Sequence, residues 1–125
     1  MNYLSPQELL FIHYRLTEEM NGIQGIQNLS ILKKLAKYVH NNEIFPDKFS
    51  KASALLFGIA KKKPFRDLNK QSAALITKIF LSLNKATLHL ESQALSEFLK
   101  DKLEKATIEE IKKAIVDNST NLEKQ

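Results

Sequence analysis

The sequence of 125 residues contains no cysteine, and this absence excludes several kinds of site at once. A disulfide scaffold, a thiol nucleophile and a cysteine-based zinc site all require it. The chain also has no run of the roughly 18 apolar residues that a membrane-spanning helix needs. Its N-terminus shows no basic segment followed by an apolar one, as a leader peptide would. We therefore expect a cytoplasmic protein without a membrane partner.

Arginine is scarce, because 17 of the 19 basic residues are lysine. A net charge of +5 and an isoelectric point near 9.4 suit a protein that binds nucleic acid. Reading of base edges, however, depends heavily on arginine. Several lysines, such as Lys33, Lys34 and Lys37, fall on the polar face of an expected helix. The charge suits an acidic partner or a polyphosphate ligand as well, so a nucleic-acid-binding or other basic interaction module is kept only as a third hypothesis.

The sequence has the length and composition of one soluble globular domain. It is 43% hydrophobic and 26% charged, which is ordinary for such a domain, and its length is sufficient for a single core. No internal repeat or second domain is evident. We expect the domain to cover residues 3–117, followed by a frayed polar tail at 118–125.

Helical spacing of apolar residues and helix-start patterns predict an all-α fold of about six helices. The helices are expected to begin near Ser5, Asn28, Asp47, Leu68, Ser92 and Thr107. Two of them, at residues 49–62 and 68–83, are apolar on most sides and are joined by a short turn that contains Pro64. Such a pair is typical of a central helix–loop–helix unit. Residues 87–90 alternate in polarity and predict a short extended segment, too short to found a sheet.

His13 lies on the apolar face of the first expected helix. No second histidine or carboxylate stands at a recognisable metal-ligand spacing from it. We therefore expect a hydrogen-bonded core histidine rather than a ligand.

The stretch 61–74 predicts a phosphate-binding loop between the two apolar helices. The N-terminus of a helix presents unpaired N–H groups and a positive dipole end, which attract anions. Lys63 and Lys70 stand on either side of it, and Asp67 and Asn69 add oxygens that could ligate Mg²⁺. The alternative is a solvated loop in which Asp67 or Asn69 caps a helix and the lysines complement the dipole of the preceding one.

The segment from Lys63 to Ala73, KPFRDLNKQSA, resembles the loop motif of the Fic/Doc family in its death-on-curing branch. That motif runs His-x-Phe-x-Asp-(Gly or Ala)-Asn-Lys-Arg-Thr-Ala. The matching residues are Phe65, Asp67, Asn69, Lys70 and Ala73. Further similarity lies at Tyr3–Ser5, Gly22–Leu32 and Ala52–Ala60, and the resemblance covers about residues 3–117. It implies a Fic/Doc-like helical bundle.

The resemblance also implies a chemistry and a set of partners. In this family the loop histidine deprotonates a hydroxyl on a protein target, the aspartate holds Mg²⁺, and the asparagine, lysine and arginine hold nucleotide phosphates. Carried over, Asp67 would bind Mg²⁺, and Asn69 and Lys70 would bind the phosphates of ATP or another nucleotide. Fic members transfer AMP, whereas death-on-curing members are toxins that phosphorylate a target such as elongation factor Tu. An antitoxin protein that inserts a helix at the site restrains these toxins.

Three positions make the loop degenerate relative to that motif. Lys63 replaces the catalytic histidine, Gln71 replaces the phosphate-binding arginine, and Leu68 replaces a small residue. A free lysine has a pKa of about 10.4 and is a poor base at neutral pH, while glutamine lacks the charged bidentate grip of arginine. We expect a phosphate- or nucleotide-binding protein with impaired catalysis. The alternative is an active transferase that moves phosphate or AMP from ATP to a protein hydroxyl.

Two phenylalanines are expected to have packing roles. Phe65 stands beside a proline turn between apolar helices and is predicted to be a buried anchor of the loop, not a stacking platform for a base. Phe45, in the segment 44–46, is expected to pack against the core. A second interpretation of this segment comes from the resemblance, because Fic/Doc proteins have a flap over the site near here.

Overall fold

The computed structural model describes residues 1–123. Over these residues the chain forms six helices and two short strands, which confirms the predicted all-α fold. Their bounds are α1 (Pro6–Met20), α2 (Leu29–Tyr38), α3 (Lys48–Lys62), α4 (Asn69–Leu83), β1 (Ala86–Leu88), α5 (Ser92–Lys102), α6 (Ile108–Asp117) and β2 (Ser119–Asn121). None of these helices is long and apolar enough to cross a membrane.

Most helices begin at a side chain that caps them. Ser5 accepts a hydrogen bond from the Glu8 amide and so starts α1, and the caps Asn28, Asp47 and Thr107 do the same for α2, α3 and α6. These caps satisfy N–H groups that the first turn leaves unpaired. Leu68, at the start of α4, supplies no such bond. The first turn of α4 is therefore left without a side-chain cap.

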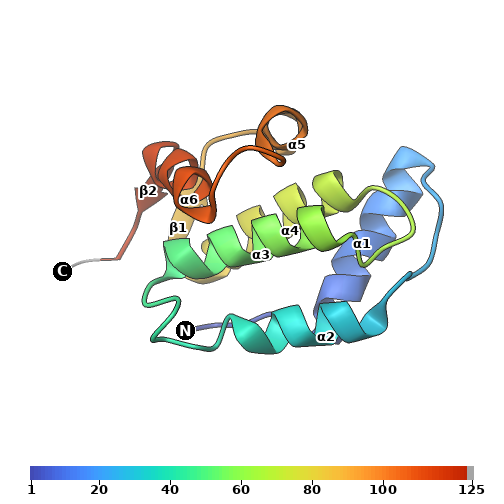
Figure 1. Ribbon diagram of the computed structural model, residues 1–125, viewed down its shortest axis with the longest axis horizontal. Coiled ribbons are helices and arrows are strands. Elements are labelled where there is room, and N and C mark those ends of the chain that lie inside the picture. The colour runs from blue at the N-terminus through green and yellow to red at the C-terminus, as the bar shows by residue number, and fades with distance from the viewer. Residues whose placement is uncertain (124–125) are drawn as a thin grey trace.

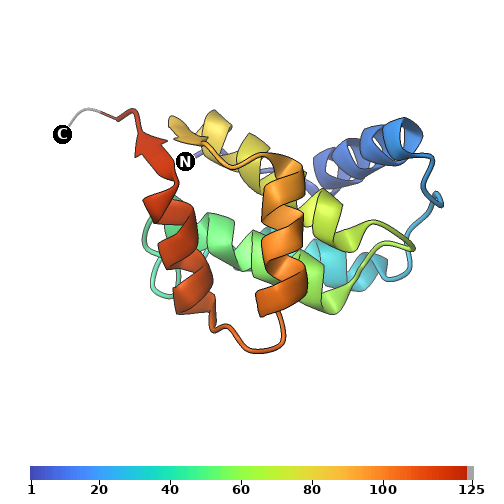
Figure 2. The ribbon, with the colours of Figure 1, turned by 90° about the horizontal axis from the view of Figure 1, so that it is seen from above.

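Helices α3 and α4 form the centre of the molecule, as predicted. Figure 1 shows α2 on one side of this pair and α5 and α6 on the other, with α1 packed beside α4. In Figure 2, α5 and α6 run across the direction of the central helices, and α5 packs on α4 while α6 packs on α3. A helix that is apolar on most sides must be covered on most sides, and this arrangement covers α3 and α4.

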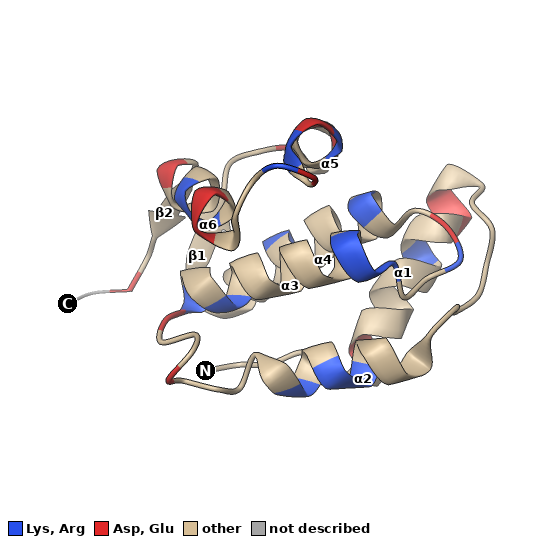
Figure 3. Ribbon diagram, viewed as in Figure 1, with Lys and Arg blue, Asp and Glu red and all other residues tan. Residues whose placement is uncertain are grey.

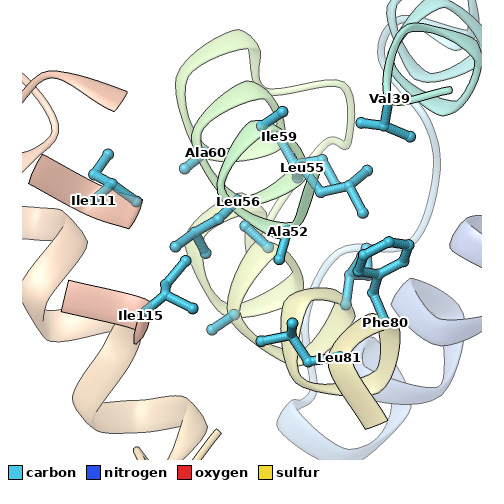
Figure 4. Packing of buried hydrophobic residues seen from close by; sticks show 14 of the residues in the cluster. Val39, Ala52, Leu55, Leu56, Ile59, Ala60, Phe80, Leu81, Ile111 and Ile115 are labelled. Atoms are coloured by element: carbon cyan, nitrogen blue, oxygen red, sulfur yellow. The ribbon is translucent and has the colours of Figure 1, made fainter. Parts of the chain in front are cut away.

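Side chains of α3 contact different neighbours on each of its faces. In Figure 4, Leu56 points toward Ile111 and Ile115 of α6, whereas Leu55 points toward Val39 beyond α2. All five of these residues are buried. One core therefore extends through both sides of the central pair.

The C-terminal segment is held in place by strand pairing. β1 pairs antiparallel with β2, with Thr87 opposite Thr120. The predicted extended segment is therefore present, but the expectation that the chain frays from residue 118 does not fit this pairing. Residues 124–125 of the expected tail lie outside the described residues.

The buried ammonium of Lys48 explains why this segment is ordered. Lys48 is only 5% exposed. Its Nζ donates to the Asn84 carbonyl at 2.9 Å, to Asn121 Oδ1 at 2.6 Å and to Glu123 Oε1 at 2.6 Å. The Lys48 ammonium thus connects the start of α3 to the end of α4 and to the C-terminal segment. No local pattern marks this contact, because its partners stand 36 to 75 positions away along the chain.

We predict that Lys48→Met lowers the free energy of unfolding by about 1–3 kcal/mol, because it leaves the buried Asn84 carbonyl and the Glu123 carboxylate without this donor. Lys112→Met is the matched control, since the Lys112–Asp47 ion pair at 3.4 Å is partly solvated and such pairs contribute about 0–1 kcal/mol. Urea unfolding measures both variants. An equal loss of unfolding free energy in both variants would show that the Lys48 ammonium does not stabilise the C-terminal segment.

Candidate functional site

The loop between α3 and α4 reverses the chain through two residues of left-handed backbone. Lys63, the C-cap of α3, has φ 52°, and Leu68, the N-cap of α4, has φ 58°. This conformation costs a residue that carries a Cβ about 1–2 kcal/mol. It also explains why a small residue suits position 68. The surrounding contacts must therefore hold the loop in its shape.

The side-chain amide of Asn69 closes this loop. Its Oδ1 accepts from the Phe65 N–H at 3.0 Å, and its Nδ2 donates to the Phe65 carbonyl at 3.0 Å. Both main-chain polar groups of Phe65 are satisfied by one side chain. Because Nδ2 carries two hydrogens, one of them stays available to a ligand.

The carboxylate of Asp67 ties the loop to the connection between α1 and α2. Oδ2 accepts from the Ile23 N–H at 3.0 Å and Oδ1 from the Leu68 N–H at 2.9 Å. A carboxylate oxygen has two lone pairs, so each retains one for a cation. Within residues 1–123 no group of three potential metal-ligating His, Cys, Asp or Glu side chains exists. Mg²⁺ still fits Asp67, because it binds through one or two carboxylates with phosphate and water as further ligands.

The connection 21–28 packs directly against the loop. The Pro64 carbonyl accepts from the N–H groups of Gln27 and Asn28 at 2.7 and 2.9 Å. The Arg66 N–H donates to the Gly25 carbonyl at 3.2 Å. Gly25 has φ +121°, a conformation that favours glycine. The glycines of this connection predicted a loop with unusual backbone angles. They did not predict that the loop would pack against residues 64–68.

The segment 44–46, in contrast, lies far from the loop. It precedes α3, whereas the loop follows the C-terminal end of that helix (Figure 1). The 15 residues of α3 separate the two by about 22 Å at the usual helical rise. Phe45 is buried and meets Tyr38 edge-on at 5.0 Å. The packing interpretation of Phe45 is therefore right, and the flap interpretation is wrong.

Phe65 is 1% exposed and lies against the imidazole of His13. The two ring centroids are 3.8 Å apart and the rings are nearly parallel, at 6°. Its burial supports the role of anchor and leaves it no free face on which a base could stack.

His13 is buried, as expected, but only one of its ring nitrogens has a partner. Nδ1 lies 2.6 Å from Ser72 Oγ in the first turn of α4. Nε2 is buried and, within residues 1–123, has no hydrogen-bond partner. Burial lowers the pKa of His13 below its usual value, and the opposing effect of the Asp67 charge is smaller. This contact joins residues 59 positions apart, so no local signal could have revealed it.

Basic side chains surround the loop on its exposed side. Lys63 is exposed, and Lys70 and Gln71 are partly exposed. Figure 3 places the basic end of α3 and the basic start of α4 beside the loop. The structure thus brings all of the predicted binding residues onto one loop and one helical turn. That turn is the uncapped start of α4, where N–H groups remain available to an anion.

We predict that Phe65→Ala lowers the free energy of unfolding by about 3–5 kcal/mol, because it opens a cavity under the loop. Phe11→Ala is the matched control, since Phe11 is 61% exposed and its loss should change stability by at most about 0.5 kcal/mol. The midpoint of urea unfolding measures both. An unchanged midpoint in Phe65→Ala would count against the anchor.

Comparison with known families identifies a relationship that includes this loop. A sequence model described as the Fic/DOC family matches residues 3–81. The match extends over more than half of the 125-residue chain, from the segment before α1 almost to the end of α4. Comparison with curated proteins gives no match.

Proposed function

Because the chain belongs to the Fic/DOC family, we propose that its α3–α4 loop binds the phosphates of a nucleotide such as ATP, together with Mg²⁺. We further propose that its transferase activity is impaired by Lys63 and Gln71. The observation that carries the binding proposal is the uncapped first turn of α4 beside a loop closed by its own side chains.

An anion at this turn would find donors of three kinds. They are the unpaired N–H groups of the first turn, the ammonium of Lys70, and the remaining amide hydrogen of Asn69. The loop is fixed on both sides, by the connection 21–28 and by the side chain of Phe65. A site that is held before the ligand arrives loses less entropy on binding.

Asp67 would hold Mg²⁺ through its carboxylate. When bound, the ion neutralises phosphate charge and polarises the phosphoryl oxygens. The N–H groups of Ile23 and Leu68 each donate to this carboxylate and so hold it in one orientation. Gln71 can offer a phosphate only neutral hydrogen bonds, which are about half as strong as charge-assisted ones.

The chemistry is proposed to fail at the proton-transfer step. A lysine becomes an effective base chiefly when burial disfavours its charged form. Lys63 is exposed at the end of α3, and bound phosphates would stabilise its charge further. A nucleotide-binding protein that lacks turnover is the function that best fits these residues.

A second candidate is an active toxin of the death-on-curing type, restrained by an antitoxin. The observation in its favour is the family membership itself, together with the presence of Asp67, Asn69 and Lys70 in the loop. Such an enzyme would transfer phosphate or AMP from ATP to a hydroxyl of a protein such as elongation factor Tu.

We predict that Lys70→Ala weakens the binding of ATP about 10- to 100-fold, as expected for the loss of a charged hydrogen bond. Lys78→Ala is the control, because Lys78 lies on the same helix about 12 Å along its axis and should leave the affinity unchanged. Calorimetry at low salt, with and without Mg²⁺, measures both. If neither ATP nor inorganic phosphate binds, the retained part of the motif serves the fold alone.

We predict that Lys63→His combined with Gln71→Arg raises phosphate or AMP transfer well above that of the wild type. Loss of a general base commonly costs about 10²–10⁴ in rate, so its return should be visible over background. The assay follows label from γ- and α-labelled ATP into proteins of a bacterial lysate. Strong transfer by the wild type that Lys63→Ala abolishes would instead establish the active enzyme.

A further inference from the structure

We propose that His13 is the positioning residue of the phosphate-binding loop: as a neutral imidazole it holds Phe65 and the first turn of α4 in place, and protonation releases them. This inference deepens the proposed function and rests on it only for the identity of the ligand. His13 would touch no ligand itself, because its contacts are with residues next to those that do.

The imidazole connects three elements that are distant in sequence. It belongs to α1, its ring face lies on Phe65 of the loop, and its Nδ1 meets Ser72 of α4. Phe65 is held by Asn69, and Ser72 directly follows Gln71. A movement of this ring therefore reaches both the loop and the turn that are proposed to hold phosphate.

The surroundings suit the neutral ring better than the protonated one, because an unpaired neutral nitrogen costs less than an unpaired charged donor. A neutral imidazole has one donor and one acceptor nitrogen, while the cation has two donors. Ser72 can accept from one of them. Nε2 would become a buried charged donor without a partner among the described residues, which is costly in a protein interior. Protonation therefore favours an arrangement in which this edge of the ring reaches water.

Burial of His13, and to a lesser extent the charges around it, decide the pH at which this happens. Arg66 and Asp67 lie on the loop, Lys70 on α4, and Arg15 and Glu18 on the exposed side of α1. Of these, Asp67 raises the pKa of His13 through space, and burial lowers it by more. The unfolded chain therefore takes up the proton first, so stability falls as the pH drops below about 6.5.

The other two histidines do not supply this control. His40 stacks on Tyr3 at 3.7 Å beyond the far end of α2, and His89 pairs with Thr120 beside β2. Both are exposed. The chain has only these three histidines, so the imidazole under the loop can be followed individually.

The test is an NMR titration from pH 7.5 to 5 without ligand, with His40→Gln and His89→Gln used to assign the imidazole signals. We expect the amides of residues 65–68 and 72 to shift with the titration of His13. In His13→Gln, which keeps a polar partner for Ser72 but cannot titrate, these shifts should disappear. Loop amides that do not follow His13, or that still shift in His13→Gln, would overturn the proposal.

Ser72→Ala keeps the test decisive if His13→Gln fails to fold. It removes the hydrogen bond but leaves the imidazole on Phe65. The first turn of α4 should then no longer follow the titration of His13, while residue 65 still does. If residue 72 follows His13 unchanged, the hydrogen bond does not transmit the effect and the proposal is wrong.

Binding of ATP and Mg²⁺ at pH 7.5 and 5.5 supplies the functional measurement. Affinity of the wild type should fall about tenfold more than that of His13→Gln, as for the loss of about one hydrogen bond of positioning. The phosphates of ATP titrate in the same way in both measurements, so comparing the two proteins removes their contribution to the pH dependence. Equal pH dependence in both proteins would overturn the positioning role. If neither protein binds ATP while the loop amides follow His13, the proposed ligand is wrong and the role of His13 stands.

Discussion

The two hydrogen bonds between the Asn69 amide and the Phe65 backbone determine the geometry of the loop on which the site depends. They hold a reversal that begins and ends in left-handed backbone at Lys63 and Leu68. That backbone costs about 1–2 kcal/mol at each of the two positions. The hydrogen bonds return about 1 kcal/mol each, and burial of the Phe65 side chain adds about 1.5–3 kcal/mol. The net stabilisation of the loop by these contacts is therefore small. Its other contacts are needed to keep it in this shape.

Those remaining contacts come from parts of the chain that the central helices bring together. The connection 21–28 supplies backbone partners to Pro64, Arg66 and Asp67, and α1 supplies the imidazole beneath Phe65. Because α1 packs on α4 and α2 packs on α3, both ends of this connection are anchored to the central pair. The apolar faces that define the core therefore also align the groups around the loop.

The sequence was sufficient for features whose cause is local. Ser5, Asn28, Asp47 and Thr107 cap helices through amides only three positions away, so their patterns predicted those helix starts correctly. The loop was located by Pro64 and by the apolar helices on either side. The contacts of Lys48 and of His13 were not predictable, since they join residues 36 to 75 positions apart. The prediction of a flap at residues 44–46 was wrong for a related reason. Whether a segment lies near the loop depends on how the helices pack, not on its position along the chain.

The loop residues that match the motif by resemblance differ in their contacts from those that do not. Phe65, Asp67 and Asn69 each make contacts that shape the loop, so the fold alone gives a reason for their presence. Lys63 and Gln71, which differ from the histidine and arginine of the motif that the loop resembles, form no side-chain hydrogen bond with any of residues 1–123. A chain that kept only the fold would match the motif in this way.

Lys70 is the residue that separates the two explanations. Its ammonium forms no hydrogen bond or ion pair with residues 1–123, and it stands on the uncapped first turn of α4. A lysine at this position works against the helix dipole, which favours negative charge at an N-terminus. The fold therefore gives no reason for a cation here, whereas a bound phosphate would. Together with the uncapped turn, this charge supports the proposal that the loop binds a phosphate-bearing ligand.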